Sequence, residues 1–268
     1  MNGDRDPQPG HWLSLCVGKF IEHTDPGAFS LYVWNNNVED QFVNDYLRFV
    51  PNCKLVVPEP GIELIHVHAD PLQRLYEMAR SDGCEYVITL DSDAHPLNSA
   101  WLPNLIGGLE RGAALAGVYR DELSHAIEPY IHASCLATSV SFVEEHGLRY
   151  DYIAPNEPGI FHDTLSSFTA AARDSGSALH PLHRSNERNF HRLMGGIYGD
   201  LIYHHGAGSR PLVDFWDEAG TNESRLRNRQ IGDISAHFLY TDYDRDTTFL
   251  MGGDAGALSA RLHALGEG

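Results

Sequence analysis

Short runs of β-branched and aromatic residues alternate with stretches of helical periodicity over the first two thirds of the chain. This alternation is typical of an α/β domain with a largely parallel sheet. The runs predict strands over residues 12–17, 29–34, 54–57, 86–90 and 114–119. Apolar positions at helical spacing predict helices over 42–50, which Pro51 ends, over 72–79 and over 101–109, the last with Asn98 or Ser99 as N-cap.

The chain is richer in loops from about Leu148 onward, as expected for a variable face that meets a substrate. A helix is expected over 164–173, and a last strand over 199–204 leads into a Gly-rich turn at 206–210. We therefore expect a flexible N-terminus at 1–10, a single α/β domain at 11–210 and a helical C-terminal extension at 211–268.

The charge balance excludes some partners. The chain has 19 Lys and Arg against 37 Asp and Glu, a net charge of −18, which argues against nucleic acid or an anionic membrane surface. Its longest apolar stretches are far shorter than the roughly 20 residues of a membrane span. The N-terminus has no apolar signal region, so we expect a cytoplasmic location. The cysteines form no CxxC pair, which disfavours a disulfide framework, and the sequence leaves a homodimer open.

The most informative segment is residues 86–96, an apolar strand that ends in Asp91, Ser92 and Asp93. In open α/β sheets ligands bind outside the carboxyl ends of the strands, and carboxylate oxygens suit Mg²⁺ or Mn²⁺. The alternative is that the two aspartates only cap the following turn.

Histidines and one further aspartate add candidates. His204 and His205 end the last expected strand, where strand alternation sends their side chains to opposite faces, so one of them faces a metal more easily and we favour His204. His95, two residues beyond the acidic pair, is a candidate to support the metal ligands. Asp163 is also a good helix N-cap, whatever chemistry it performs.

The run at 86–96 resembles the Asp-x-Asp motif of GT-A glycosyltransferases, especially the family 2-like enzymes. Four further segments, 31–40, 85–117, 162–176 and 203–210, resemble the family in the same order, so the likeness covers about residues 12–210. The resemblance implies a GT-A fold, which is Rossmann-like with a mostly parallel sheet flanked by helices. It also implies a nucleotide-sugar-binding half at 11–120 and an acceptor-binding half at 121–210.

The resemblance further implies an inverting transfer of a sugar from a nucleotide diphosphate donor to a hydroxyl of a glycan or small metabolite. UDP is favoured, with dTDP and GDP behind it. Asn35 stands where the family often has a base-contacting aspartate, so the identity of the base stays open. The implied donor contacts are Asn35, Asn36, Asp40, Asp91, Ser92 and Asp93. The implied ligands of Mn²⁺ or Mg²⁺ are Asp91 and Asp93 with His204 or His205. Asp163 would be the general base. Independently, a chain at −18 with two lysines needs a cation from solution to neutralise a diphosphate.

Other classes of protein fit less well. A phosphatase of the haloacid-dehalogenase type needs a downstream lysine, and none follows Lys54. A non-haem iron oxygenase could use His68, Asp70 and a distant histidine, but Asp70-Pro71 indicates a helix start where that site needs strands. A sugar nucleotidyltransferase needs a Gly-rich basic loop near the N-terminus, where only Gly18-Lys19 occurs. An inactive nucleotide- or glycan-binding module remains an alternative.

Overall fold

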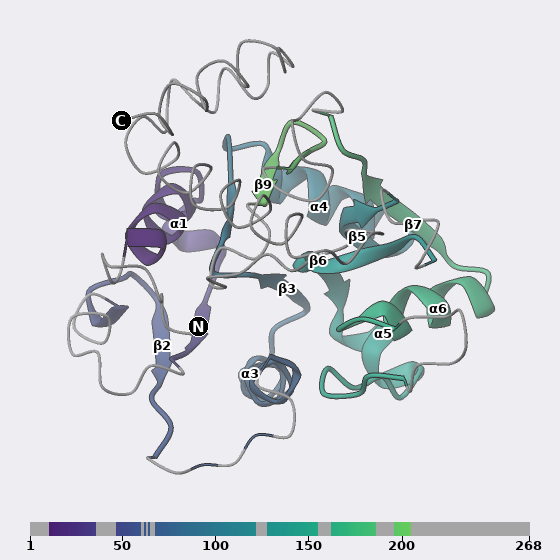
Figure 1. Cartoon of the computed structure of the whole chain (residues 1–268), viewed down its shortest axis with the longest axis horizontal. Helices are drawn as coiled ribbons and strands as arrows, with labels where there is room; N and C mark the ends of the chain where they lie inside the picture. The colour runs from purple at the N-terminus through teal and green to yellow at the C-terminus, as the bar shows by residue number, and fades with distance from the viewer. Residues whose placement is uncertain are drawn as a thin grey trace, which may run out of the picture.

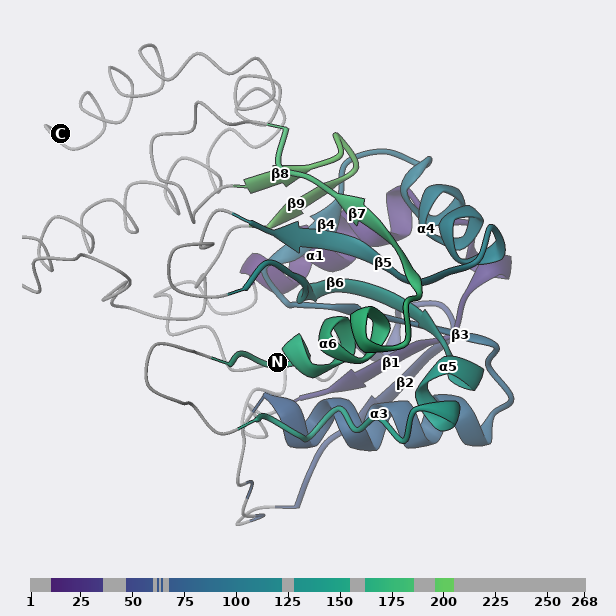
Figure 2. The ribbon, with the colours of Figure 1, turned by 90° about the vertical axis from the view of Figure 1, so that its right-hand side faces the viewer.

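The computed structural model describes residues 11–35, 47–59, 62, 64, 68–121, 128–154, 162–185 and 196–204. Over these residues the chain is a mixed α/β structure in which a four-stranded sheet has helices on both faces (Figure 1, Figure 2). The expected flexible N-terminus at 1–10, the turn at 206–210 and the helical extension at 211–268 lie outside the described residues.

The four-stranded sheet contains β3 (Tyr86–Leu90), β5 (Ala113–Arg120), β6 (Tyr130–Ser139) and β7 (Ala178–Leu182), in the order β3-β6-β5-β7. Strand β6 is antiparallel to both β3 and β5, whereas β7 is parallel to β5. Strands β3, β5 and β7 therefore run in one direction and β6 runs against them, so the sheet is mixed and the expected parallel arrangement is interrupted at β6. The physical reason is that β6 follows β5 after a short connection and returns directly beside it.

Two smaller sheets complete the described strands. Strands β1 (Leu31–Trp34) and β2 (Cys53–Val56) form a parallel pair. Strands β4 (Ala94–Pro96), β8 (Gly196–Tyr198) and β9 (Ile202–His204) form an antiparallel sheet in the order β4-β9-β8. Gly199 and Asp200 both have positive φ, 59° and 56°, between β8 and β9. That conformation matches the tight turns that join twisted hairpin strands.

The described helices are α1 (His11–Glu22), the short 3₁₀ helix η1 (Pro26–Ala28), α3 (Ala69–Ser81), α4 (Trp101–Glu110), α5 (Val140–Glu145) and α6 (Ser166–Asp174). Helices were expected near α3, α4 and α6, and residues 47–48 close the expected helix at 42–50, whose earlier part is not described. Helix α4 begins after Ala100, and Asn98 accepts a bond from the Ala100 amide instead of capping the helix itself.

Residues 12–17 form the first part of α1, so the expected strand there is wrong. The apolar positions continue beyond the short run to Phe20 and Ile21. Cys16 and Phe20 are buried and four residues apart, which places them on one face of a helix. Phe20 packs against Phe29 and Trp101, with ring centroids 4.6 and 5.9 Å apart.

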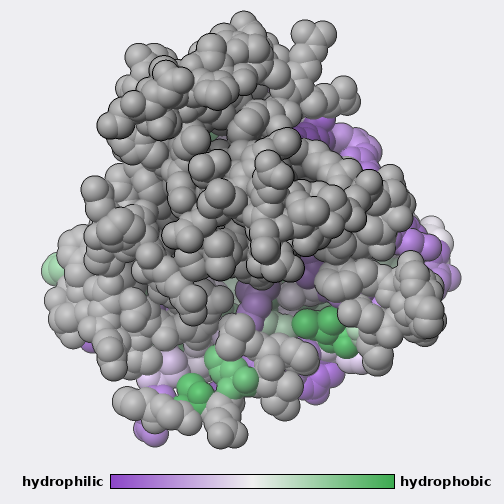
Figure 3. All heavy atoms as spheres, in the orientation of Figure 1, coloured by the Kyte–Doolittle hydropathy of each residue, from purple (hydrophilic) through white to green (hydrophobic). Residues whose placement is uncertain are grey.

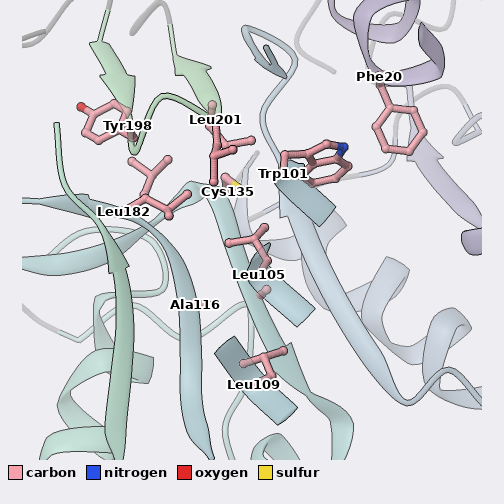
Figure 4. Close-up of a cluster of buried hydrophobic side chains, with 12 residues drawn as sticks. Phe20, Trp101, Leu105, Leu109, Ala116, Cys135, Leu182, Tyr198 and Leu201 are labelled. Atoms are coloured by element: carbon pink, nitrogen blue, oxygen red, sulfur yellow. The ribbon is translucent and has the colours of Figure 1, made fainter. Parts of the chain in front are cut away.

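Apolar side chains pack on both faces of the four-stranded sheet. On one face Trp101, Leu105 and Leu109 of α4 pack with residues of α1, β5, β8 and the turn before β9 (Figure 4). On the other face Phe168 of α6 packs with residues of α3 and α5. Figure 2 shows the small sheet of β4, β8 and β9 on the α4 side and α3, α5 and α6 on the opposite side.

The outer surface of the described residues is mixed in character. On the face seen in Figure 3, hydrophobic residues lie in separate patches beside hydrophilic ones. The described helices include none that is both long and apolar enough to cross a membrane.

Candidate functional site

Asp91 and Asp93 lie where β3 ends, as the sequence indicates. The chain turns immediately after Leu90, and the Ala94 amide donates to the Asp91 carbonyl oxygen at 3.0 Å before β4 begins. Asp93 is buried and Asp91 is half-buried. Ser92 lies between them and is also half-buried. This turn holds two carboxylates close together with little access to water.

His204 reaches the same place from a segment more than a hundred residues away. Strand β9 pairs with β4 so that His204 is the direct partner of Ala94, the residue after Asp93. The His204 Nε2 atom lies 3.6 Å from Asp93 Oδ1 and 4.0 Å from Asp91 Oδ2. An ion bound about 2.1 Å from two ligand atoms holds those atoms roughly 3 to 4 Å apart. Each aspartate therefore lies at a distance from His204 that two ligands of one ion would have.

His132 of β6 is a member of the site that the sequence did not indicate. Its ring lies 5.2 Å from that of His204, and Asp91, His132 and His204 offer ligand atoms that all lie within 4.8 Å of one another. The Ser134 amide donates to His132 Nδ1 at 2.9 Å. In a neutral ring whose Nδ1 accepts a hydrogen bond, the proton is on Nε2. His132 therefore presents an N–H at Nε2, which is the wrong tautomer for binding a metal through that atom.

A bulge in β6 places His132 in the site. Gly117 pairs with Leu136 and Tyr119 with Ile131, so residues 132–135 lie opposite the single residue Val118. Gly117 has a φ of 144°, and a Cβ atom there would lie 1.9 Å from the Cys135 carbonyl oxygen. Glycine is thus required where β5 passes the bulge. The hydrogen bond from the Ser134 amide to His132 joins two residues of the bulge and stabilises it.

Asp163 lies just before α6, with its carboxylate tied to β6. Tyr130 donates its hydroxyl to Asp163 Oδ2 at 2.6 Å, and the Thr164 amide donates to Oδ1 at 2.8 Å. His132 Nε2 lies 3.8 Å from Asp163 Oδ2. The helix N-cap is Leu165 rather than Asp163, so the capping interpretation does not hold. The side chain of Asp163 is 38% exposed, which leaves its carboxylate open to a ligand.

His68 also contacts the acidic pair, from the residue before α3. Its Nε2 lies 3.0 Å from Asp91 Oδ1. Asp70 lies in the first turn of α3. Among the described residues, the group whose ligand atoms all lie within 4.8 Å of one another is Asp91, His132 and His204, and it includes neither Asp70 nor Asp93. An iron site built on His68 and Asp70 therefore finds no support in this geometry.

Of the expected nucleotide contacts outside the acidic turn, only Asn35 is described. Asn35 is buried at the end of β1, and its backbone N–H donates to the Val56 carbonyl oxygen at 2.9 Å. Asn36, Asp40 and His205 lie outside the described residues. His95 is buried in β4, where its ring stacks on Tyr203 with centroids 5.2 Å apart.

Burial and charge set the protonation of the site. Burial raises the pKa of Asp91, but the positive charge and hydrogen bond of His68 outweigh it, and the pKa lies below its usual range. Burial, with a smaller contribution from the charge of Arg120, lowers the pKa of His204 to about 3 and that of His132 to about 4. Near neutral pH the site thus holds an ionised Asp91 beside neutral imidazoles. An ionised Asp91 and a neutral His204 are the protonation states that a metal binds.

Comparison of the sequence with protein-family models finds no match, and no curated protein matches it either. What the site binds is therefore inferred from its own residues.

Proposed function

We propose that this protein is a metal-dependent glycosyltransferase of GT-A fold that transfers a sugar from a nucleotide diphosphate, UDP favoured, to a hydroxyl acceptor. The observation that carries the proposal is the meeting of Asp91, Asp93 and His204, from β3 and β9, next to the partly exposed Asp163. A two-carboxylate and one-imidazole set beside a separate carboxylate suits binding of an anionic leaving group next to a base.

The donor atoms fit Mn²⁺ or Mg²⁺. Two carboxylates supply the hard oxygen ligands that these ions prefer, and neutral His204 adds a nitrogen. The ion would neutralise the diphosphate and act as a Lewis acid for its departure. His68 holds Asp91 Oδ1 and thereby leaves Oδ2 turned toward His204.

Asp163 is the proposed general base. Tyr130 and the Thr164 amide each donate to one oxygen of its carboxylate and fix its orientation. Each carboxylate oxygen has a second lone pair, so Asp163 can still accept the proton of an acceptor hydroxyl. Attack by that hydroxyl opposite the departing diphosphate would invert the configuration of the anomeric carbon.

A second candidate is a non-haem iron enzyme, because Asp91, His132 and His204 make up a two-histidine, one-carboxylate set. The hydrogen bond from the Ser134 amide to His132 Nδ1 disfavours it, since Nε2 then carries the proton. Binding of Fe²⁺ in preference to Mn²⁺, with loss in His132→Ala but not in Asp93→Asn, would favour this candidate.

Calorimetric titration of UDP with and without Mn²⁺ tests the proposed function. We expect UDP to bind only with the metal, and Asp93→Asn and His204→Ala to abolish that binding. Asp151→Asn is the matched control, because it makes the same change in a carboxylate that pairs with Arg149. Equal UDP binding in EDTA would contradict the proposal. Metal-dependent UDP binding without sugar transfer from any nucleotide sugar would instead indicate an inactive binding module.

A further inference from the structure

Two arginines lie at the edge of the sheet that carries the candidate site. Strand β5 ends at Arg120, which pairs directly with Tyr130, the residue that holds Asp163. Strand β7 runs parallel to β5 with Leu182 level with Val118, and Arg184 follows two residues after the end of β7. Arg184 also forms an isolated bridge with Tyr198 of β8. Both arginines thus follow the strands toward the same edge.

Arg120 is buried, with 6% of its surface exposed. Strand alternation places it on the same face as Val118, which packs with α4, Tyr198 and Ile202. Its charge contributes to lowering the pKa of both His132 and His204, and the charge of Arg184 contributes at His204. Geometry places Arg120 at the histidine end of the site as well, because its strand partner Tyr130 has its ring 5.7 Å from that of His132.

The backbone of Arg120 lies nearer to Tyr130, which holds Asp163, than to the strand that leads into the acidic turn. In the strand order β3-β6-β5-β7, the strand of Arg120 lies two strands from β3, and β7, which precedes Arg184, lies three strands from it. Neighbouring strands are about 4.8 Å apart, so the backbone of Arg120 is roughly 10 Å from that of β3. Tyr130, which donates to Asp163, is the direct strand partner of Arg120.

The net charge of the chain makes the two arginines important for binding an anionic substrate. The chain has a net charge of −18, so an anionic substrate is repelled by the molecule as a whole. Guanidinium groups bind carboxylate and phosphate oxygens through paired, charge-assisted hydrogen bonds. A buried guanidinium is a stronger partner for such a group than an exposed one, because water competes less.

We propose that Arg120 and Arg184 form a subsite for an oxyanion of the acceptor, which is then a hydroxyl compound carrying a carboxylate or a phosphate. The inference rests on the proposed function for the roles of Asp163 and of the metal ligands. In this arrangement the acidic group of the acceptor lies on the two arginines while its hydroxyl reaches Asp163. A neutral polyol of the same size lacks this anchor.

Binding of three matched probes tests the subsite: D-glycerate, sn-glycerol 3-phosphate and glycerol, titrated calorimetrically without nucleotide. We expect glycerate or glycerol phosphate to bind and glycerol not to bind, and the preferred anion identifies the group. Arg120→Gln and Arg184→Gln should each weaken anion binding about tenfold or more, the loss of one charge-assisted bond. Arg80→Gln is the control, because it removes the same charge at an exposed ion pair with Glu144.

The outcomes separate this proposal from its rivals. Equal binding of glycerol and the two anions, or unchanged anion binding in both subsite variants, would overturn it. Weaker Mn²⁺·UDP binding in these variants with anion binding unchanged would assign the arginines to the donor and also overturn it. If Arg120→Gln fails to fold, the half-buried Arg184 decides the question. Because the probes are measured without nucleotide or turnover, failure here leaves the metal-dependent binding of UDP as a separate result.

Discussion

Asp163 combines a buried anchor with an exposed carboxylate, and its replacement tests its role directly. We predict that Asp163→Asn lowers turnover about 10² to 10⁴-fold, the usual contribution of a general base, while Mn²⁺-dependent UDP binding persists. The fold should survive, because Leu165 rather than Asp163 is the N-cap of α6. Steady-state kinetics and calorimetry on the same preparation check both parts. Near-normal turnover would remove Asp163 from the reaction, and NMR of the product shows whether the anomeric centre is inverted.

Tyr130 offers a subtler test, because it acts on Asp163 and not on the donor. Its hydroxyl donates to Asp163 Oδ2 at 2.6 Å, so Tyr130→Phe removes one of the two hydrogen bonds that orient the carboxylate and leaves only that from the Thr164 amide. One hydrogen bond to a charged group is worth about 1.5 to 3 kcal/mol, so turnover should fall roughly tenfold or more, with UDP affinity unchanged. Tyr119→Phe is the control, because the Tyr119 hydroxyl accepts from Arg173 instead. Equal loss in both variants would contradict a positioning role for Tyr130.

The sequence indicates those site residues whose neighbours along the chain are enough to place them at the end of a strand. Asp91 and Asp93 follow an apolar strand, and His204 ends another, so their proximity follows from the rule that strand ends collect ligands. His132 was missed because the strand that contains it was not expected. The alternation of Tyr130, His132 and Ser134 in a run without helix breakers is the signal that would have indicated a polar strand face.

Among the elements, β6 depends most on one glycine of its neighbour. A Cβ at Gly117 would lie 1.9 Å from the Cys135 carbonyl oxygen, so the two strands must separate in Gly117→Ala. We predict a loss of about 2 to 4 kcal/mol in the free energy of unfolding, measured by urea denaturation. Mn²⁺ affinity should also fall, because the Asp91 amide donates to the Ser134 carbonyl oxygen within the bulge.

Gly112→Ala is the matched control for that variant. Gly112 also has a positive φ, 98°, but no atom lies within 4 Å of a Cβ built there. Its replacement should therefore cost only the backbone strain, about 1 kcal/mol, and leave Mn²⁺ affinity unchanged. Equal losses of stability in the two variants would show that strain, and not the contact with Cys135, makes Gly117 necessary.

The strands and helices show where the spacing of apolar residues predicts an element correctly and where it does not. Strand β3 has the predicted limits, because its run is short, apolar and bounded by polar residues. The sequence predicts a strand where the first part of α1 forms, because the six residues 12–17 carry too few positions to separate a period of 2 from one of 3.6. The antiparallel return of β6 depends on its pairing with β3 and β5, which local pattern does not encode.

The molecule as a whole buries several histidines, and this makes its stability sensitive to acid. His95 lies in β4 with its Nδ1 donating to the Pro96 carbonyl oxygen at 3.1 Å, and burial lowers its pKa from 6.5 to about 4. Above pH 6.5 the ring is neutral in both the folded and the unfolded chain. As the pH falls from 6.5 toward 4, the unfolded chain binds the proton and the folded one does not, so stability is lost.

We therefore predict that the His95→Asn variant has a flatter dependence of stability on pH than the parent protein. Asparagine retains a donor for the Pro96 carbonyl oxygen but does not titrate. Between pH 7 and pH 5 the variant should therefore lose about 2 kcal/mol less unfolding free energy than the parent protein. The acid sensitivity from the buried rings of His132 and His204 remains in both proteins.

Urea denaturation in EDTA at pH 7, 6 and 5 provides the comparison and removes any effect of metal binding. The variant should be less stable than the parent at pH 7, because the stacking of His95 on Tyr203 is lost, and the difference should narrow toward pH 5. Parallel curves for the two proteins would show that His95 is protonated inside the folded structure.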